Sequence, residues 1–235
     1  MGLELKIIET KAMQKPAELD LESSRHEDSE LMQSWLAKRP DTESVAGFVA
    51  GPGIERLQLK FDIVELRKAL ESALQQIGYK TDDYGFGGFP LTRRPGVEVE
   101  TANDRSGLFF TRVDESYSEV QREETVDEHA FSELVPAHQG SYFEEVVTEL
   151  KARFSIGRVR VLSKGVYNCN SWHRDPEPRL HIPIQTNPGS LFIVNHHVTH
   201  LPADGSVYFT DTRGYHTALN GGESDRVHIV AALPQ

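Results

Sequence analysis

The second half of this 235-residue chain consists of short apolar runs separated by turn signals, and this pattern restricts the fold more than any other feature. From Arg158 the residues alternate between polar and apolar, and further runs of strand-forming residues follow at 191–194, 207–210 and 226–230. The turns between them are Asn187-Pro188-Gly189, Ala203-Asp204-Gly205, residues 211–214 and Asn220-Gly221-Gly222. Short strands at this spacing predict a jelly roll or closed barrel, which limits exposed sheet edges.

Two amphipathic helices are expected before this β-rich part. Apolar residues repeat with a helical period over residues 63–77, Asp62 is a plausible N-cap, and Gly78 ends the pattern. A second helix is expected over residues 141–154, which carry an apolar stripe on one side. Residues 24–38 hold a further helical stripe, which we expect to pack in a core.

The length and composition are those of a globular protein with one core. A chain of 235 residues with 38% hydrophobic residues is long enough for one large domain. We therefore expect a single domain over residues 1–235, in which a helical and irregular part of about residues 1–155 packs on a β core of about residues 156–235. The fold class is accordingly mostly β with flanking helices (α+β).

Charge and hydropathy argue against several classes of partner. The formal net charge of -11 at pH 7 repels polyanions, so we expect no nucleic-acid partner. No apolar run approaches the roughly 18 residues that suggest a membrane span, and the first residues do not resemble a secretory signal, so we expect a cytoplasmic protein. Cys169 is the only cysteine, which excludes an internal disulfide and a zinc site made of several thiolates; we expect it to be a small buried residue.

The segment around His173 contains the residue types of a metal site. His173 and Asp175 are two residues apart, so in an extended segment their side chains leave the same face. A later strand can supply His216, which lies 43 residues after His173. Two histidines and one carboxylate on one side of an ion leave the opposite coordination positions open, as in non-haem Fe(II) oxygenases. The sequence therefore predicts His173, Asp175 and His216 as ligands of a catalytic metal.

Arg226 is a candidate anion-binding residue beside that metal. It lies 10 residues after His216, across the Asn220-Gly221-Gly222 turn, which can fold two strands back on each other. A guanidinium at the mouth of the site can form paired hydrogen bonds with the far carboxylate of a keto-diacid. A keto-diacid could therefore bind beside the metal at this position.

Other polar and aromatic residues have simpler interpretations. His228 is expected to be a packed core histidine, Trp172 a packed aromatic residue beside the site, and Asn220 a turn residue. The histidines at positions 196, 197 and 200 are not expected to form a second metal site, because adjacent strand residues point to opposite faces.

Three segments before the β-rich part have open roles. Residues 84–90 are rich in glycine but do not match a phosphate-binding loop, so they predict a plain loop. Arg93 and Arg94 are expected to be solvated, with binding of a substrate carboxylate as the alternative. Residues 114–133 contain eight acidic residues and are expected to be solvated, with an acidic lid that favours a basic substrate as the alternative.

The second half of the chain resembles the aspartyl/asparaginyl β-hydroxylases, a family within the Fe(II)- and 2-oxoglutarate-dependent dioxygenases of double-stranded β-helix (jelly-roll, cupin-like) fold. The similarity covers roughly residues 136–232 and, faintly, residues 89–96. The segments that carry it are residues 140–146, Gly157-Arg158-Val159-Arg160, Ser171-Trp172-His173-Arg174-Asp175, Arg179-Leu180-His181-Ile182-Pro183-Ile184, residues 216–220 and Arg226-Val227-His228.

The resemblance implies a role for each matching residue. His173, Asp175 and His216 would bind Fe(II), and Arg226 would bind the distal carboxylate of 2-oxoglutarate. Arg179 and His181 match the family's Arg-x-His pair, which would lie near the co-substrate carboxylate at the metal. Because this chain retains Asp175, the resemblance favours hydroxylation over halogenation, since related halogenases replace this carboxylate to admit a halide.

The leading hypothesis from the sequence is an Fe(II)- and 2-oxoglutarate-dependent dioxygenase that uses O2 to hydroxylate an amino-acid side chain, free or within a peptide. The expected partner is therefore a small amino-acid or peptide substrate. Two other hypotheses remain open. One is a metal-bearing β-barrel that binds or senses a ligand without turnover. The other is a cupin-type dioxygenase that needs no keto acid, which would leave Arg226 without a role.

Overall fold

The computed structural model describes residues 21–37, 47–78, 80–81, 86–98, 109–111, 119–121 and 126–235. The chain forms two compact units, Met1–Glu43 and Ser44–Gln235. The first unit contains helix α1 (Leu21–Leu36), whose stripe of Leu31, Met32, Trp35 and Leu36 is exposed. The expected core packing of this stripe is therefore not seen in the described part of its unit, and a single domain over residues 1–235 stays a prediction.

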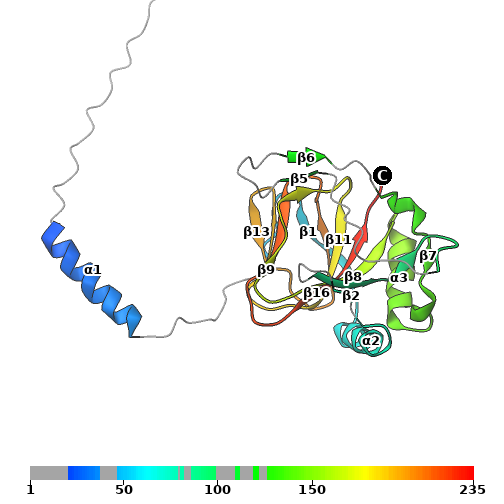
Figure 1. The fold of residues 1–235 in the computed structure, drawn as a ribbon, viewed down its shortest axis with the longest axis horizontal. Helices are drawn as coiled ribbons and strands as arrows, with labels where there is room; N and C mark the ends of the chain where they lie inside the picture. Colours follow the sequence, from blue (N-terminus) through cyan, green and yellow to red (C-terminus); the bar gives the residue numbers. More distant parts are fainter. Residues whose placement is uncertain are drawn as a thin grey trace, which may run out of the picture. The chain divides into compact units, whose positions relative to one another are not determined.

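The second unit is built on two antiparallel β-sheets (Figure 1). The larger sheet has seven strands, in the order β1 (Ile54–Lys60), β14 (Ser206–Thr210), β11 (Arg179–Gln185), β16 (Arg226–Ala232), β8 (Val159–Lys164), β3 (Phe86–Pro90) and β2 (Lys80–Thr81). The smaller sheet has the order β13 (His197–Thr199), β12 (Ser190–Val194), β15 (His216–Asn220), β10 (His173–Arg174), β5 (Phe109–Thr111) and β6 (Glu119–Gln121), and β9 (Asn168–Cys169) also pairs with β15. A separate ribbon pairs β4 (Thr92–Arg93) with β7 (Glu133–Leu134).

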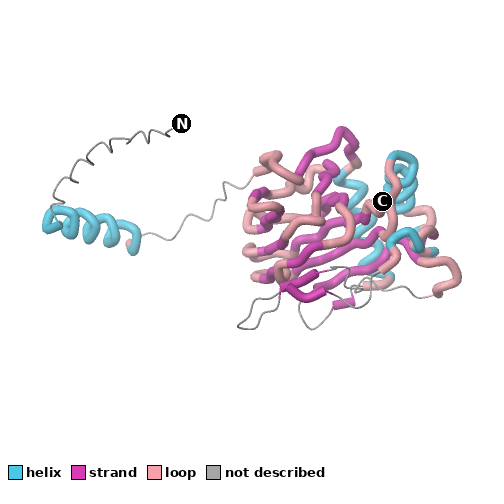
Figure 2. The backbone as a smooth tube through the Cα atoms, turned by 90° about the horizontal axis from the view of Figure 1, so that it is seen from above, coloured by secondary structure: helices cyan, strands magenta, loops and turns pink. Residues whose placement is uncertain are grey.

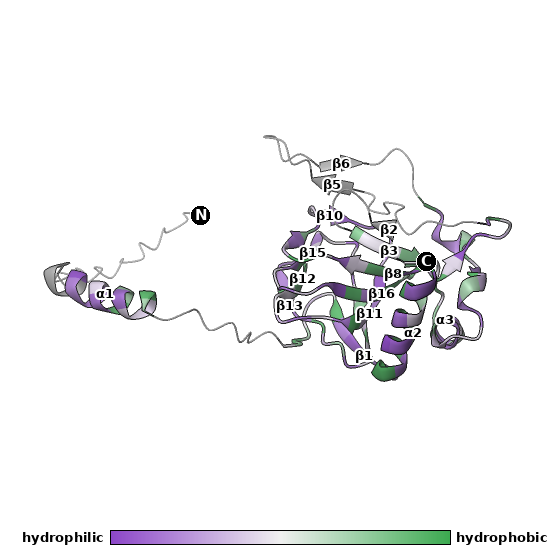
Figure 3. Ribbon diagram, turned by 60° about the horizontal axis from the view of Figure 1, so that its bottom comes forward, coloured by the Kyte–Doolittle hydropathy of each residue, from purple (hydrophilic) through white to green (hydrophobic). Residues whose placement is uncertain are grey.

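From β8 onward the chain passes back and forth between the two sheets. Strands β8, β11, β14 and β16 belong to the larger sheet, whereas β10, β12, β13 and β15 belong to the smaller one (Figure 3). The turns expected around residues 188, 204 and 221 all lie between strands. This alternation between two antiparallel layers is a double-stranded β-helix, or jelly roll, so the predicted fold class is confirmed.

One expected loop is instead a strand. Phe86–Pro90 forms β3, which pairs with β8 from Phe86 opposite Lys164 to Pro90 opposite Arg160. The glycines there predict a loop, but the open edge of β8 supplies hydrogen-bond partners, and tertiary context overrides strand propensity. The prediction was wrong for residues 86–90, and the remainder of that segment lies outside the described residues.

Helices α2 (Ile63–Gln76) and α3 (Tyr142–Arg153) pack on one side of the strands, as predicted (Figure 2). The side chain of Asp62 caps α2 by accepting hydrogen bonds from the backbone N–H groups of Val64 and Glu65 at 2.8 and 3.3 Å. Two short 3-10 helices, η1 (Glu128–Ala130) and η2 (Pro136–His138), precede α3. Within the described residues, no helix has both the length and the hydrophobicity to span a membrane.

Alternation along the strands gives the larger sheet two chemically different faces. Every second residue packs with α2 and α3 in the main core; in β11 and β16 these residues are Leu180, Ile182, Ile184, Val227, Ile229 and Ala231. The residues between them point into the barrel toward the smaller sheet, and they include Arg179, His181, Arg226 and His228. Part of the barrel interior is apolar, with Ile54, Tyr208, Phe192, Val194, Leu201 and Ala218 in one cluster.

Candidate metal centre

The three predicted metal ligands converge where β10 and β15 pair in the smaller sheet. Strands β10 and β15 pair so that His173 lies opposite His216, and the centroids of the two rings are 4.1 Å apart. Asp175 follows β10, where its backbone N–H donates a hydrogen bond to the carbonyl oxygen of Thr212 at 2.8 Å. One possible ligand atom from each residue lies within 4.8 Å of the others, and Nε2 of His216 is 3.6 Å from Oδ2 of Asp175.

Backbone carbonyl groups orient both imidazole rings. Nδ1 of His173 is 2.7 Å from the carbonyl oxygen of Ser171, and Nδ1 of His216 is 3.1 Å from that of Gly214. A carbonyl oxygen can only accept a hydrogen bond, so each Nδ1 carries the proton and each Nε2 presents its lone pair. Histidine ligands of metals are usually held in this way through their second ring nitrogen.

The donor set fits a divalent metal such as Fe(II). Two donor atoms that are each ~2.1 Å from one ion lie ~3 Å apart at a right angle, so small side-chain shifts are enough to bring the three ligand atoms to one ion. Asp175 and His216 are buried, whereas His173 is only half buried. Two imidazoles and one carboxylate on one side leave other coordination positions for exchangeable ligands.

Local electrostatics favour the metal-binding forms of these groups. Burial is the largest single influence on the Asp175 carboxyl and on its own would raise the pKa. The charge of Arg179, the two neighbouring imidazoles and the hydrogen bond from Arg179 together outweigh it, and the pKa falls to about 2. Burial, followed by the proximity of His173, lowers the pKa of His216 to about 4. At neutral pH Asp175 is therefore a carboxylate and His216 a neutral imidazole, as metal binding requires.

Arg226, His228 and His181 form a connected polar line inside the barrel. Nη2 of Arg226 donates a hydrogen bond to Nδ1 of His228 at 3.0 Å, and that nitrogen is 3.4 Å from Nδ1 of His181. The ring of His181 lies 5.0 Å from that of Phe192, which in turn lies 6.0 Å from His216, measured between centroids. His228, expected only to pack in the core, is thus the hydrogen-bond partner of Arg226.

The charges along this line differ at neutral pH. Burial lowers the pKa of Arg226 to about 10, which still leaves its guanidinium charged. Burial, with the charge of Arg226, moves the pKa values of His181 and His228 well below the usual value, so both rings are neutral. The line therefore carries one positive charge at the Arg226 end.

Arg179 is surrounded by carboxylates. Its Nε is 3.2 Å from Oδ2 of Asp175, its Nη2 is 2.6 Å from Oε1 of Glu177, and its Nη1 is 3.5 Å from Oε1 of Glu128. Burial would lower the pKa of Arg179, but these carboxylates raise it above its usual value, and burial raises the pKa of Glu177 to about 7. Arg179 thus contacts the predicted metal carboxylate directly, and its expected contact with 2-oxoglutarate stays a prediction.

Sequence reasoning missed several buried charged residues around this site. Glu128 belongs to the acidic run that was expected to be solvated, yet it is only 4% exposed. Arg158, Arg160 and Lys164 are also buried, at or within β8. The alternation of Arg158 and Arg160 was an available signal for a shared face, whereas no local pattern announces Glu128. The other acidic residues of this run lie partly outside the described residues.

Two residues near the ligands are more exposed than expected. Trp172, which directly precedes β10, is 46% exposed. Cys169, in the short strand β9, is also exposed. The predictions of a packed Trp172 and a buried Cys169 were therefore wrong.

The remaining candidates make local contacts. Nε2 of His197 and Nδ1 of His200 lie 2.8 and 2.9 Å from the backbone carbonyl oxygens of Val49 and Ser190. Asn220 was expected to be a turn residue, but it is the last residue of β15 and is buried. Its side-chain amide donates hydrogen bonds to the carbonyl oxygens of Lys164, Gly165 and Ser224.

Of the two arginines after β3, Arg93 pairs with Glu133 at 3.0 Å, and the guanidinium of Arg94 lies 5.2 Å from the centroid of the Phe131 ring. Both side chains thus have partners within the protein, and binding of a substrate carboxylate by either stays a prediction.

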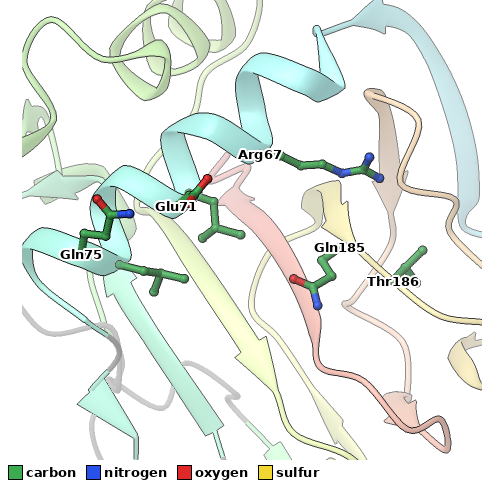
Figure 4. Close-up of a pocket in the computed structure, with 7 residues that line it drawn as sticks. Arg67, Glu71, Gln75, Gln185 and Thr186 are labelled. Atoms are coloured by element: carbon green, nitrogen blue, oxygen red, sulfur yellow. The ribbon is translucent and has the colours of Figure 1, made fainter.

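A pocket of about 600 Å³ lies away from the metal ligands, between α2 and the end of β11 (Figure 4). Its lining includes Arg67, Glu71 and Gln75 of α2 and the neighbouring residues Gln185 and Thr186. The pocket is on the helix side of the larger sheet, where Nε of Arg67 donates a hydrogen bond to the carbonyl oxygen of Ile184 at 3.3 Å. None of the predicted metal ligands lines it.

Comparison with known proteins gives only distant likenesses. No protein-family model and no curated protein sequence matches the chain. Among solved structures, it is similar to a 2OG-Fe(II) oxygenase family oxidoreductase from Burkholderia pseudomallei, with a TM-score of 0.45, 13% identity, and coverage of 77% of this chain and 83% of the other. It is also similar to the viral collagen prolyl hydroxylase of Paramecium Bursaria Chlorella virus-1, in complex with 2OG, with a TM-score of 0.42 and 10% identity. That match covers 77% of this chain and 96% of the other. A cupin domain from Bordetella pertussis matches with a TM-score of 0.29 and 17% identity, over 33% of this chain and 81% of the other.

The strand order identifies the fold, and the residues of the site are the basis for the proposed function.

Proposed function

We propose that this protein is an Fe(II)- and 2-oxoglutarate-dependent dioxygenase that hydroxylates an amino-acid side chain, free or within a peptide. The observation that carries the proposal is the convergence of His173, Asp175 and His216, with both imidazole rings turned to present Nε2. Bound Fe(II), with 2-oxoglutarate and O2, would supply an oxidant able to replace a C–H bond by C–OH. The resemblance to the aspartyl/asparaginyl β-hydroxylases supports the same chemistry.

Arg226 is the proposed anchor for the distal carboxylate of 2-oxoglutarate. It is buried and charged, and His228 holds its guanidinium through Nδ1. Because Nδ1 of His228 accepts that hydrogen bond, the proton lies on Nε2, which is buried and has no hydrogen-bond partner among the described residues. Such a donor is available to a bound anion, so His228 supports the proposal as a neighbour of the co-substrate.

The barrel supplies the surroundings that this chemistry needs. Phe192 and Ala218 lie in the apolar cluster between the sheets, and the ring of Phe192 contacts His216. Apolar side chains beside the ligands exclude water and keep the reaction directed at the bound substrate. We propose a small amino-acid or peptide substrate and action in the cytoplasm.

The test is an anaerobic titration of metal-free protein with Fe(II) and then 2-oxoglutarate. The proposal expects a visible metal-to-keto-acid charge-transfer band in the wild type and its loss in His216→Ala. Succinate release can then be screened against candidate amino acids and peptides. Iron binding without the band would instead favour a keto-acid-independent dioxygenase or a binding protein without turnover.

A further inference from the structure

A chain of buried ion pairs leads from the 3-10 helix η1 to the metal carboxylate. Oε1 of Glu128 is 2.8 Å from Nη2 of Arg158 and 3.5 Å from Nη1 of Arg179, and Nε of Arg179 is 3.2 Å from Oδ2 of Asp175. All four side chains are at most 7% exposed. Charges in such surroundings are weakly screened, so each contact affects its neighbours.

The residues around Glu128 pack closely against its backbone and its ion pair with Arg158. Gly157 precedes Arg158, and a Cβ atom at Gly157 would lie 2.5 Å from the carbonyl oxygen of Glu128, closer than any side chain tolerates. The ring of Phe131 lies over Arg158, with 5.1 Å between the guanidinium carbon and the ring centroid. The glycine permits close approach, and the aromatic ring covers the pair from the side of η1.

We infer that Glu128 is a positioning residue for the metal carboxylate: it holds Arg179, and Arg179 holds Asp175. This inference rests on the proposed function, because it assigns Asp175 to the metal. Glu128 has a second effect through its charge, because it offsets the arginines beside the site. Without that carboxylate, less negative charge would offset Arg158 and Arg179, so the two guanidinium groups would repel a divalent cation at Asp175 more strongly, although Glu177 would still lie 2.6 Å from Arg179.

The first test compares Co(II) affinity, followed by visible absorption, in wild type, Glu128→Gln and Glu133→Gln. Residues that hold metal ligands in place typically change metal affinity by ~10- to 100-fold when substituted, and we expect a loss of that size in Glu128→Gln. Glu133→Gln is the matched control: Glu133 also pairs with an arginine, at 3.0 Å from Arg93, but it is 43% exposed and lies outside the chain of ion pairs. We expect its affinity to equal that of the wild type.

A second variant separates positioning from general damage to the buried pair. Arg158→Gln breaks the same Glu128–Arg158 contact, so it should destabilise the fold as Glu128→Gln does. It removes a positive charge and leaves Glu128 with Arg179, so Co(II) affinity should not fall. Equal weakening of Co(II) binding in both variants would mean that the contact is structural, and the inference would be overturned.

Two more variants keep the test decisive if Glu128→Gln does not fold. The double variant Glu128→Gln/Arg158→Gln leaves no lone buried charge from this pair but still removes the contact with Arg179, so it should bind Co(II) more weakly than Arg158→Gln. Glu128→Asp keeps the charge on a shorter side chain and should restore part of the affinity. If the double variant and Arg158→Gln bind Co(II) equally well, Glu128 has no positioning role.

The outcome for the wild type distinguishes the inference from the proposed function. A wild type that binds neither Co(II) nor Fe(II) would contradict the proposed function itself. A wild type that binds both metals, together with unchanged affinity in Glu128→Gln, would contradict only the inference about Glu128.

Discussion

The two faces of the larger sheet use the same strands for different purposes. In β11, Leu180 and Ile182 pack with the helices, whereas Arg179 and His181, which alternate with them, face the candidate metal centre. The helix face derives its free energy from burial of apolar area, which tolerates some change of shape. The barrel face depends on charges and hydrogen bonds, which fail when one partner is lost. Substitutions at adjacent positions of one strand should therefore affect either the stability of the fold or ligand binding, but not both.

The largest expected effect is on activity and comes from the barrel interior. His173→Ala and Asp175→Ala should each lower substrate-coupled succinate formation by more than the ~100-fold typical of residues that only support a metal ligand. The free energy of unfolding of the metal-free protein should change little in His173→Ala, because His173 is only half buried. Asp175→Ala should also destabilise the fold, because it takes a carboxylate from the buried guanidinium of Arg179. Succinate assays and urea unfolding measure the two quantities. Full activity in both variants would exclude this metal site.

The opposite pattern is expected for Ile182→Ala, one residue from His181. Ile182 is fully buried in the main core, so its truncation should lower the free energy of unfolding by about 2–5 kcal/mol. Urea unfolding measures this loss, and Co(II) affinity of the folded variant should equal that of the wild type. A large fall in Co(II) affinity would show that the two faces of β11 are coupled.

The features that the sequence predicted correctly depend on local patterns within one segment. Period-2 alternation and turn residues are local and predicted the jelly roll, and the helical period of apolar residues, also local, predicted both flanking helices. The cluster of His173, Asp175 and His216 was predicted because two of its members share one segment and the third follows a recognisable spacing.

The parts that could not be predicted depend on contacts between distant segments. Strand β3 forms because the edge of β8 is available, although its glycines favour a loop. Glu128 lies in an acidic run with no periodic pattern, and it is buried only because Arg158 and Arg179 neutralise it. Whether a charge is solvated or paired in the interior depends on tertiary partners, which a single segment does not reveal.

A third prediction concerns Arg226, at the far end of the polar line from His181. Arg226→Lys keeps a positive charge but loses the paired donors of the guanidinium, so it should raise the 2-oxoglutarate concentration needed for half-saturation by ~10- to 100-fold. Titration of the charge-transfer band measures this change without turnover. Co(II) affinity in the absence of 2-oxoglutarate should not change. If Arg226→Lys needs the same 2-oxoglutarate concentration for half-saturation as the wild type, then Arg226 does not bind 2-oxoglutarate.

The fourth prediction is a pH dependence of the metal-free protein. Burial lowers the folded-state pKa values of His138, His181, His216 and His228 below the usual 6.5, so the unfolded chain binds more protons below that pH. Stability is therefore present above about pH 6.5 and is lost as the pH falls. Glu177 contributes a pH dependence of stability of the opposite sign, because its folded-state pKa of about 7 exceeds the usual 4.5. The four histidines outnumber this single group.

Each such histidine contributes up to ~1.4 kcal/mol per pH unit once the pH is below its unfolded-state pKa. His138 packs on the helix side, against Phe89 and Phe143, whereas His228 lies in the barrel. Urea unfolding between pH 7 and pH 5 should show a smaller slope in His138→Gln and in His228→Gln than in the wild type. If neither substitution changes the slope of unfolding free energy against pH, then other groups cause the pH dependence.

The smallest expected effect lies at the edge of the helix layer. Asp62 caps α2 through two backbone N–H groups, so Asp62→Ala should lower the free energy of unfolding by about 1 kcal/mol, whereas Asp62→Asn keeps an acceptor and should lose less. Urea unfolding measures the difference between the two variants. Neither should change Co(II) affinity, because α2 packs on the face of the larger sheet opposite the barrel. If Asp62→Ala weakens Co(II) binding, then the helix layer also holds the metal ligands in place, and stability and ligand binding cannot be assigned to separate faces.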